Sequence, residues 1–169
     1  MAEIAPLTPA TLARVAQLTQ KTNQFNLTTR RYTEQQISEM AACPGWRVWS
    51  LRVTDRYADN GLVGVAISHL EGEVCEIDTL LMSCRVIGRT LETALLARLA
   101  EDARSRGAKR LEGWFLPTKK NAPAQDFYRC HGFVEVRRTA EGTLFEFDLT
   151  SGAIATPGWI EVAGASERA

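Results

Sequence analysis

The chain has few metal-binding residues and no apolar run long enough to cross a membrane. Its 169 residues include two histidines and four cysteines, and no two cysteines form a C-x-x-C pair, so no zinc site can be drawn. The longest clean apolar run, residues 62–67, is far short of the roughly 18 residues that a membrane helix needs. The first ten residues lack the basic and apolar regions of a signal peptide. These absences predict a cytoplasmic protein with no bound metal and no membrane partner.

Low-complexity tracts and nucleotide-binding loops are also missing. The chain is 45% hydrophobic and 24% charged, with 12 Gly and 6 Pro, which is typical of a folded domain. It contains no Walker loop, no G-x-G-x-x-G turn and no G-x-S-x-G elbow. We expect a single domain over residues 1–150. Residues 151–169, rich in Ala, Gly, Ser and Thr, then form a loosely held tail.

Net charge is absent, but the charges are unevenly distributed. In all, 20 Lys and Arg balance 20 Asp and Glu, whereas residues 85–138 hold twelve Lys or Arg against six Asp or Glu. This region could attract phosphates, an acidic carrier protein or nucleic acid. Alternatively, its charges only solvate helix faces and never converge. Because no nucleic-acid-binding motif accompanies them, we expect no nucleic-acid partner.

Cap and turn signals divide the chain into helices and strands. Thr8-Pro9 predicts the start of a helix that extends to about Lys21. Thr33 with Gln36 forms a capping box that opens a second helix, which Pro44-Gly45 ends. A meander of strands follows at residues 47–54, 61–69 and 73–82; then come a long helix (88–106), a strand (110–116), a short helix (122 or 123 to 130) and a hairpin (133–138 and 143–149). This order predicts an α/β (α+β) fold, a three-layer αβα sandwich around a mixed, mostly antiparallel sheet.

The most specific segment is NAPAQDFYRCHGF, residues 121–133. Its Asn121, Ala124, Tyr128 and Gly132-Phe133 fall at the N-x-x-A-x-x-x-Y-x-x-x-G-F spacing of the GCN5-related N-acetyltransferase (GNAT) superfamily. With the element order, the chain resembles that acyl-CoA N-acyltransferase fold from about residue 8 to 149.

Three further strings resemble the carboxy-terminal domain of FkbH-like proteins, which act in polyketide and related pathways: TQKTNQFNLTTRRY, LLMSCRVIGRTLE and PTKKN. In that family a haloacid-dehalogenase-like (HAD-like) domain usually precedes this one and loads a three-carbon unit onto an acyl carrier protein. The chain is then either an excised domain or a stand-alone relative, and both readings stay open.

The resemblance implies a site for a pantetheine thioester, carried by acetyl-CoA, another acyl-CoA or an acyl carrier protein. Family members hold the pyrophosphate in a loop Q/R-x-x-G-x-G/A at a helix N-terminus, and residues 87–92 keep only Gly88 of that pattern. Thr90 replaces a glycine, and the Glu92 carboxylate would repel a bound pyrophosphate. We expect the donor to contact this loop, the preceding strand edge and the motif asparagine, which could equally be a helix cap: Leu80, Leu81, Met82, Arg85, Val86, Gly88, Arg89, Thr90 and Asn121. A carrier-bound donor would demand less of this loop and would suit Lys119 and Lys120, unless these are ordinary loop charges.

The resemblance places Tyr128 where many family members use a tyrosine as general acid toward the departing sulfur. A tyrosine with its unperturbed pKa near 10 holds a proton at neutral pH, although Tyr128 could instead be a packed aromatic residue. Glu76 and Asp78 alternate on one face of the third strand, and either is a candidate general base or merely solvated. Cys84 could relay an acyl group as a nucleophile, but free cysteines are mostly packing residues.

The polar connector between the first two helices lies where the fold places its acceptor wall. We expect an anionic or hydroxylated small-molecule substrate to contact Asn23, Asn26, Thr28, Arg30 and Arg31, although a docking surface would use the same residues. The leading hypothesis is a GNAT acyltransferase with an amine, hydroxyl or thiol acceptor in a polyketide-like or FkbH-type pathway. The alternative is a catalytically degenerate module that docks a carrier protein or supports a HAD-like FkbH partner domain.

Overall fold

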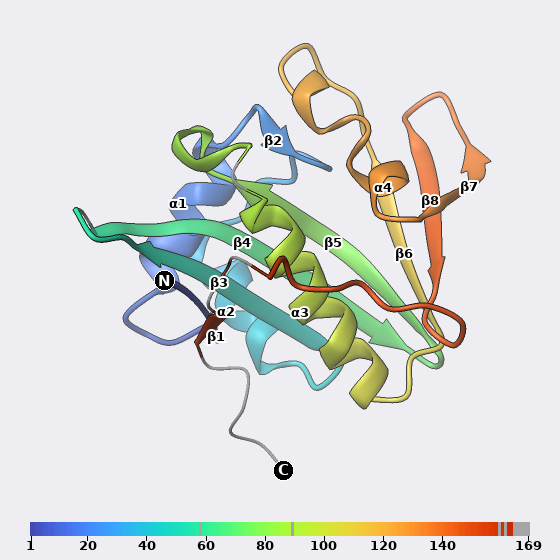
Figure 1. Ribbon diagram of the computed structural model, residues 1–169, viewed down its shortest axis with the longest axis horizontal. Helices are drawn as coiled ribbons and strands as arrows, with labels where there is room; N and C mark the ends of the chain where they lie inside the picture. Colours follow the sequence, from blue (N-terminus) through green and yellow to red (C-terminus); the bar gives the residue numbers. More distant parts are fainter. Residues whose placement is uncertain (58, 89, 159, 161, 164–169) are drawn as a thin grey trace.

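Helices cover both faces of one sheet in the computed structural model of this chain (Figure 1), which describes residues 1–57, 59–88, 90–158, 160 and 162–163. The helices are α1 (Leu12–Lys21), α2 (Glu34–Ala42), α3 (Leu91–Ser105) and α4 (Phe127–Cys130), with short 3-10 turns η1 (Cys84–Val86) and η2 (Ala122–Ala124). The strands are β1 (Ala2–Pro6), β2 (Phe25–Asn26), β3 (Trp46–Thr54), β4 (Asp59–Glu71), β5 (Val74–Met82), β6 (Arg110–Phe115), β7 (Val134–Arg138), β8 (Thr143–Asp148) and β9 (Val162–Ala163).

The sheet has the strand order β7-β8-β6-β5-β4-β3-β1-β9, with β2 paired to β5. Strands β3, β4 and β5 form the expected antiparallel meander. Strands β5 and β6 are parallel because the long helix α3 carries the chain back across the sheet between them. The β1–β9 pair is also parallel, and the other neighbouring pairs are antiparallel. The predicted mixed, mostly antiparallel sheet is confirmed.

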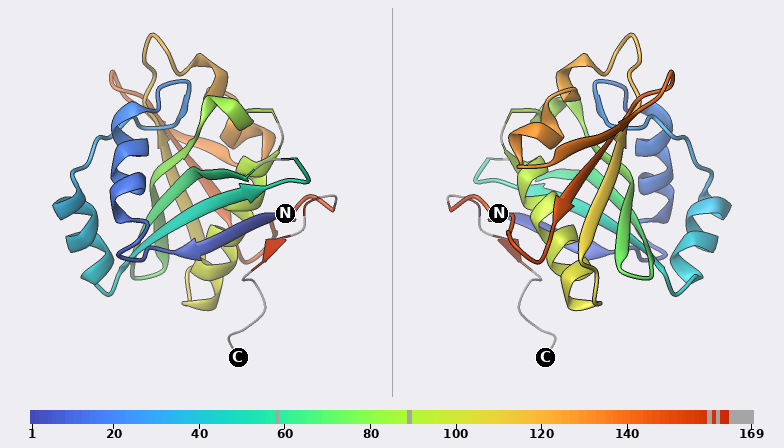
Figure 2. Two further views of the ribbon diagram at one scale, coloured as in Figure 1. Left: turned by 90° about the vertical axis from the view of Figure 1, so that its left-hand side faces the viewer. Right: turned by 90° about the vertical axis from the view of Figure 1, so that its right-hand side faces the viewer.

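Figure 2 shows the three layers, with α1 and α2 on one face of the sheet and α3 and α4 on the other. Successive side chains of each strand point to opposite faces of the sheet, so each face has its own hydrophobic core. Val48, Val65, Ile67 and Leu81 pack with α1 and α2, whereas Leu51, Ala66, Leu80 and Met82 join the larger core beneath α3 and α4. The predicted αβα sandwich is therefore confirmed.

Local capping chemistry explains one helix start and corrects another. Thr33 Oγ1 accepts the Gln36 N–H at 3.2 Å and the Thr33 N–H donates to Gln36 Oε1 at 2.9 Å, as the capping box predicts. The predicted start of the first helix at Thr8-Pro9 is wrong, because α1 begins at Leu12. Thr11 Oγ1 accepts the Thr8 N–H at 2.9 Å and holds residues 8–11 in a turn before the helix.

After β8 the chain crosses the outer side of α3 and reaches β1 (Figure 1). Arg104 Nη2 on α3 donates to the Leu149 carbonyl at 3.0 Å, and Ile154 and Ile160 are partly buried against the core. The boundary at residue 150 and the loosely held tail remain predictions. Among the helices that the structure describes, none is both long and apolar enough to cross a membrane.

Candidate functional site

Strands β5 and β6 part after a short paired stretch, and the opening between them, here called the fork, positions the candidate site. Residues 74–77 of β5 pair with residues 110–113 of β6, and the pairing stops there. A β-bulge marks the same point, because Ile67 of β4 pairs with Thr79 and Ser68 with Ile77, which leaves Asp78 without a β4 partner. Figure 1 shows the two strands diverging toward the upper end of the sheet.

The hydroxyl of Tyr128 lies where the two strands part, on the α3 side of the sheet. The ring is 1% exposed and packs against Phe133 and Phe145. A Cβ on Gly113 of β6 would lie 2.1 Å from Tyr128 Oη, so only glycine lets the hydroxyl reach this position. Tyr128 is thus both a packed aromatic residue and a candidate acid at the fork.

The electrostatic surroundings keep the Tyr128 proton in place. Burial raises the pKa of Tyr128 well above its ordinary value, and the negative charge of Glu76 raises this pKa further. Within the described part of the chain, Tyr128 Oη has no hydrogen-bond partner. An unsatisfied buried hydroxyl costs about 1–3 kcal/mol, so a hydrogen-bonding group brought into the fork would relieve this cost.

The carboxylates of Glu76 and Asp78 both point toward Arg30 of the connector between α1 and α2. Arg30 Nη1 lies 2.7 Å from Asp78 Oδ1 and 3.9 Å from Glu76 Oε1. Asp78 Oδ2 also accepts hydrogen bonds from Tyr32 Oη at 2.7 Å and from Thr79 Oγ1 at 2.9 Å. Burial and the hydrogen bond to Asp78 raise the pKa of Tyr32, so this donor stays protonated. Asp78 is therefore an anchor for the connector, whereas Glu76, whose side chain is 41% exposed, remains open to an acceptor.

Most of the expected acceptor-binding residues hold the connector in its own fold. Arg31 Nη1 donates to the Thr19 and Thr22 carbonyls at 2.7 and 2.8 Å, and its Nη2 donates to Asn23 Oδ1 at 2.5 Å. The Arg31 guanidinium and the Asn23 side-chain oxygen are thus hydrogen-bonded to each other and to neighbouring residues of the chain.

Asn26 and Thr28 complete this scaffold. Asn26 is fully buried, donates from Nδ2 to the Thr22 carbonyl at 3.2 Å and accepts the Thr29 N–H at 2.9 Å. Thr28 Oγ1 donates to the carbonyl of Asp78 at 2.9 Å. Of the five expected acceptor residues, Arg30 is the one that faces the candidate base.

The edge of β5 at which we expect the donor to bind is paired with another segment of this chain. Residues 25–28, here called the inserted segment, run antiparallel to the upper half of β5, with Phe25 opposite Met82 and Asn26 opposite Leu81. On the other side, the Leu116 N–H that follows β6 donates to the Leu27 carbonyl at 2.9 Å. The inserted segment thus lies between β5 and β6, inside the fork.

Two residues of the loop before α3 adopt left-handed backbone conformations. Gly88 has φ 88° and Thr90 has φ 57°, which is the left-handed conformation that the glycine of the family pattern adopts easily and that costs other residues about 1–2 kcal/mol. Thr90 Oγ1 and Glu92 Oε2 are buried without a partner among the described residues. Val86 is buried in the core, Arg85 is exposed, and Arg89 lies outside the described residues. Cys84 is exposed in η1 and not in the first turn of α3.

Comparison with known proteins identifies the family. Residues 12–133 match the model of the acetyltransferase (GNAT) family. The chain belongs to the GNAT family. No curated protein sequence matches it at a significant level.

Solved structures share the fold of this GNAT domain at low identity. The ribosomal-protein-S18-alanine N-acetyltransferase of Escherichia coli is 17% identical with a TM-score of 0.67, and the match covers 95% of this chain and 100% of that chain. The GNAT domain of S. lividans PAT is 16% identical with a TM-score of 0.68, covering 86% and 89%. The PaiA N-acetyltransferase of Thermoplasma acidophilum, solved with coenzyme A, is 13% identical with a TM-score of 0.66, covering 88% and 99%. Identities at this level show the fold alone.

A histidine that the sequence interpretation did not single out ties α4 of this GNAT domain to α3. His131 Nδ1 lies 2.7 Å from the Phe127 carbonyl, and Nε2 lies 2.7 Å from Thr93 Oγ1. Because a carbonyl only accepts, Nδ1 carries a proton in this contact; Nε2 accepts from the Thr93 hydroxyl in the neutral ring and donates to it in the charged ring. His131 thereby fixes the helix that carries Tyr128. The sequence gives little sign of this role, because α4 is only four residues long.

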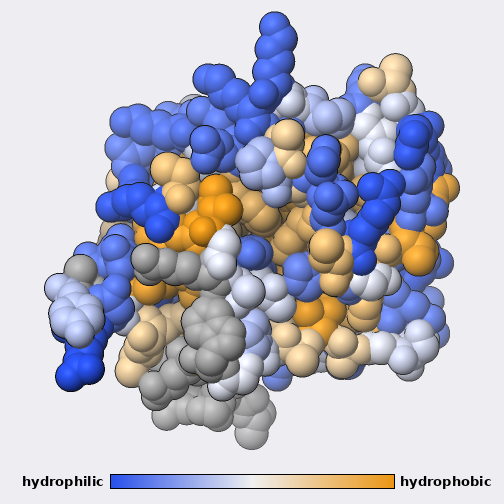
Figure 3. Space-filling view, turned by 45° about the horizontal axis from the view of Figure 1, so that its top comes forward, coloured by the Kyte–Doolittle hydropathy of each residue, from blue (hydrophilic) through white to orange (hydrophobic). Residues whose placement is uncertain are grey.

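Six of the twelve Lys and Arg side chains in residues 85–138 form ion pairs along the sheet and α3: Arg98–Glu101, Arg106–Asp102, Lys109–Glu73, Arg110–Glu146, Arg129–Glu135 and Arg138–Glu135. Arg85, Lys119 and Lys120 are exposed and form no ion pair with another described residue. They belong to η1 and the connector after β6, both at the upper end of the molecule in Figure 1. Figure 3 shows hydrophilic side chains along this rim and hydrophobic ones in the middle of the face below it.

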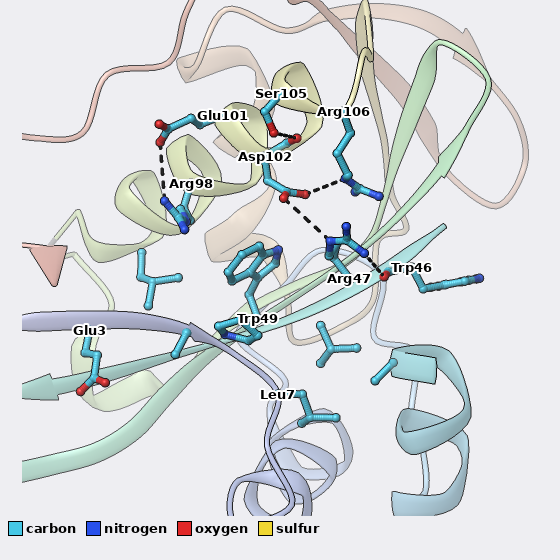
Figure 4. Close-up of a pocket in the computed structure, with 15 residues that line it drawn as sticks. Glu3, Leu7, Trp46, Arg47, Trp49, Arg98, Glu101, Asp102, Ser105 and Arg106 are labelled. Atoms are coloured by element: carbon cyan, nitrogen blue, oxygen red, sulfur yellow. Dashed lines mark hydrogen bonds and ion pairs between the residues drawn. The ribbon is translucent and has the colours of Figure 1, made fainter. Parts of the chain in front are cut away.

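A hollow of about 790 Å³ lies away from the fork, between β1, β3 and α3 (Figure 4). Asp102 contacts Arg106 at 3.0 Å and Arg47 at 3.8 Å, while Arg98 lies 3.9 Å from Glu101 and over the Trp49 ring at 5.2 Å. These charges pair with one another across the hollow. The candidate acid, base and donor loop all lie elsewhere, so the fork remains the candidate functional site.

Proposed function

We propose that this GNAT domain is an acyltransferase that moves an acyl group from a pantetheine thioester to an amine, hydroxyl or thiol acceptor. The observation that carries the proposal is the position of the Tyr128 hydroxyl at the point where β5 and β6 part, where it has no hydrogen-bond partner among the described residues and burial raises its pKa. A pantetheine thioester supplies the acyl group and a sulfur leaving group. Tyr128 holds at Oη the proton that this sulfur needs when it departs.

Glu76 is the residue best placed to take a proton from the acceptor. Its side chain is 41% exposed, and its Oε1 lies 3.9 Å from Arg30 Nη1. Asp78 orients Arg30 and Tyr32 and is a positioning residue. The acid is buried on the α3 side of the sheet, whereas the carboxylates face the connector between α1 and α2. Donor and acceptor accordingly approach the fork from opposite faces.

A carrier-protein-bound donor suits this domain better than free coenzyme A. Thr90 and Glu92 weaken the loop that would hold a pyrophosphate, while Arg85, Lys119 and Lys120, which form no ion pair with another described residue, offer positive charge to an acidic carrier. The strings that resemble FkbH-like proteins also support a carrier-bound donor, together with a HAD-like partner domain in a polyketide-like pathway.

A second candidate function is a non-catalytic module that docks a carrier protein or braces a HAD-like partner. The specific observation in its favour is the inserted segment, which occupies the donor edge, together with the Glu92 carboxylate at the start of α3.

Binding and turnover measured together separate the two functions. Acetyl-CoA, acetyl-phosphopantetheine and an acetylated carrier protein are titrated by calorimetry, with the apo carrier as control. Acyl transfer to a panel of amine and hydroxyl acceptors is followed by mass spectrometry. For an acyltransferase, Tyr128→Phe lowers turnover about 10²-fold or more and leaves donor affinity within about twofold. Tyr57→Phe, at a tyrosine that is 88% exposed, is the matched control. Binding of the carrier with no transfer in the wild type supports the docking module instead.

A further inference from the structure

The upper half of β5 offers one set of backbone groups, and the inserted segment already uses them. The Leu27 N–H donates to the Leu80 carbonyl at 3.2 Å, and the pairing continues through Leu81 and Met82. A pantetheine arm carries amides of the same kind and would pair with the same edge. The two cannot occupy it together.

Side-chain contacts close the fork around the inserted segment. Asn121 Nδ2 donates to the Asn26 carbonyl at 3.0 Å and to the Leu116 carbonyl at 2.9 Å, so one amide joins the inserted segment to the chain that follows β6. Residues 25–28 are each at most 6% exposed. In this conformation the donor arm does not fit at the β5 edge.

We propose that the inserted segment is a displaceable strand that closes the donor edge, and that an acyl donor binds only when residues 25–28 leave the fork. This inference rests on the proposed acyltransferase function and names its regulation. The segment is an internal competitor of the donor arm, and its departure sets the apparent affinity for every pantetheine thioester.

Displacement also accounts for access to the acid. Thr28 is hydrogen-bonded to Asp78, the residue after Ile77, and Ile77 pairs with Gly113, against which Tyr128 Oη lies. The lower end of the inserted segment is therefore bonded to β5 next to the last β5–β6 residue pair, and the Tyr128 hydroxyl lies against Gly113 of that pair. At its upper end, the Phe25 ring packs edge-on against Phe127 at 5.3 Å. Departure of the segment opens the space that Tyr128 needs to meet a donor.

The backbone beside the segment favours release. Thr29 has φ 55°, a left-handed conformation that is rare for a β-branched residue, and its Oγ1 is buried without a partner in the described structure. The strand itself consists of two paired residues, so few ladder bonds must break. Arg30, bound to Asp78 just after the segment, forms the hinge at which the connector stays attached.

The first test uses the wild-type chain. Hydrogen exchange of a peptide spanning residues 22–32 is measured by mass spectrometry with and without saturating acetyl-CoA or acetyl-phosphopantetheine. The proposal expects exchange in residues 25–28 to rise on donor binding while exchange in β5 stays low. Donor binding with unchanged or stronger protection of residues 25–28 overturns it.

A reversible lock gives the second test. Asn26 and Leu81 are cross-strand partners. Because the next pair, Leu27 and Leu80, is hydrogen-bonded, Asn26 and Leu81 form a non-hydrogen-bonded pair. The Cα atoms of such a pair are close enough for a disulfide. In N26C/L81C, oxidation should abolish donor binding and reduction should restore it. Equal affinity in the two redox states overturns the proposal.

A loosened variant separates this inference from the proposed function. Leu27→Gly removes the side chain that anchors the segment, and donor affinity should rise about tenfold or more, because it scales with the open fraction. Thermal unfolding confirms that the variant is folded, and Leu7→Gly, outside the fork, is the control. If L27G binds the donor more tightly but transfers no acyl group, the displaceable-strand proposal is supported and the proposed acyltransferase function is rejected. If neither the wild type nor L27G binds a donor, the inserted segment is a permanent part of the sheet and the proposal is overturned.

Discussion

Gly113 is the residue through which the packing of the fork can be tested most directly. The Cβ of Gly113→Ala would lie 2.1 Å from Tyr128 Oη and 2.4 Å from Cζ, closer than real Cβ contacts come. The Tyr128 ring cannot retreat easily, because Phe133 and Phe145 pack against it. We expect overpacking to cost about 1–3 kcal/mol in the free energy of unfolding.

A double-mutant cycle isolates that clash. In the Tyr128→Ala background the space opens, so Gly113→Ala should become nearly neutral, although Tyr128→Ala alone costs about 3–5 kcal/mol. Urea unfolding measures all four proteins, and Gly158→Ala, whose Cβ would meet nothing within 4 Å, is the matched control. If Gly113→Ala cost the same in both backgrounds, the loss would not come from a clash with Tyr128, and the placement of Tyr128 at the fork would be wrong.

Three further predictions concern the ionisable groups. Burial raises the pKa of Tyr128 and Tyr32 above the value near 10 of an unfolded chain, so their contribution to stability is present below about pH 10 and lost above it. Tyr128→Phe should reduce the loss of unfolding free energy, measured by urea titrations between pH 9 and pH 11, by about 1.4 kcal/mol in total, and an unchanged loss would place this hydroxyl in water. Glu92→Ala should tighten acetyl-CoA binding about threefold or more in calorimetry, whereas Glu101→Ala on the same helix should not; no change at Glu92 would mean that the phosphates lie elsewhere. Asp78→Asn should cost about 1–3 kcal/mol in unfolding free energy because it weakens three hydrogen bonds, while Glu76→Gln should lower turnover with stability changed by less than about 0.5 kcal/mol. The opposite pattern for these two carboxylates would exchange their roles.

The fold could be predicted because its signals are local. The capping box at Thr33, the three meander strands and the long helix each carry a cap, a turn or a periodicity within a few residues. Strand β1 escaped prediction because its alternation spans only five residues and ends at Pro6. Strand β2 escaped because two apolar residues in a polar string resemble a connector, and their partners, Met82 and Leu116, lie far along the chain.

The candidate site could be predicted only where a motif spacing fixed it. The spacing located Tyr128, but the need for Gly113 beneath its hydroxyl depends on a contact between two separate elements. The strand pattern placed Glu76 and Asp78 on one face. Their different surroundings follow from the bulge at Asp78 and from Arg30 and Tyr32 of the connector. Such register shifts and cross-element bonds leave no periodic trace in a sequence.

Asn121 is a residue of the family motif whose side chain helps to hold the fork closed. From the sequence it is either a donor contact or a helix cap, and its Oδ1 does accept the Thr118 N–H at 2.8 Å, as a local turn residue would. Its Nδ2 is committed to the Asn26 and Leu116 carbonyls, and the residue is fully buried. While the inserted segment is in place, this amide has no free hydrogen to offer a donor. Release of the segment would free the hydrogen bonded to Asn26, so Asn121 can contact a donor only in the state in which the fork is open.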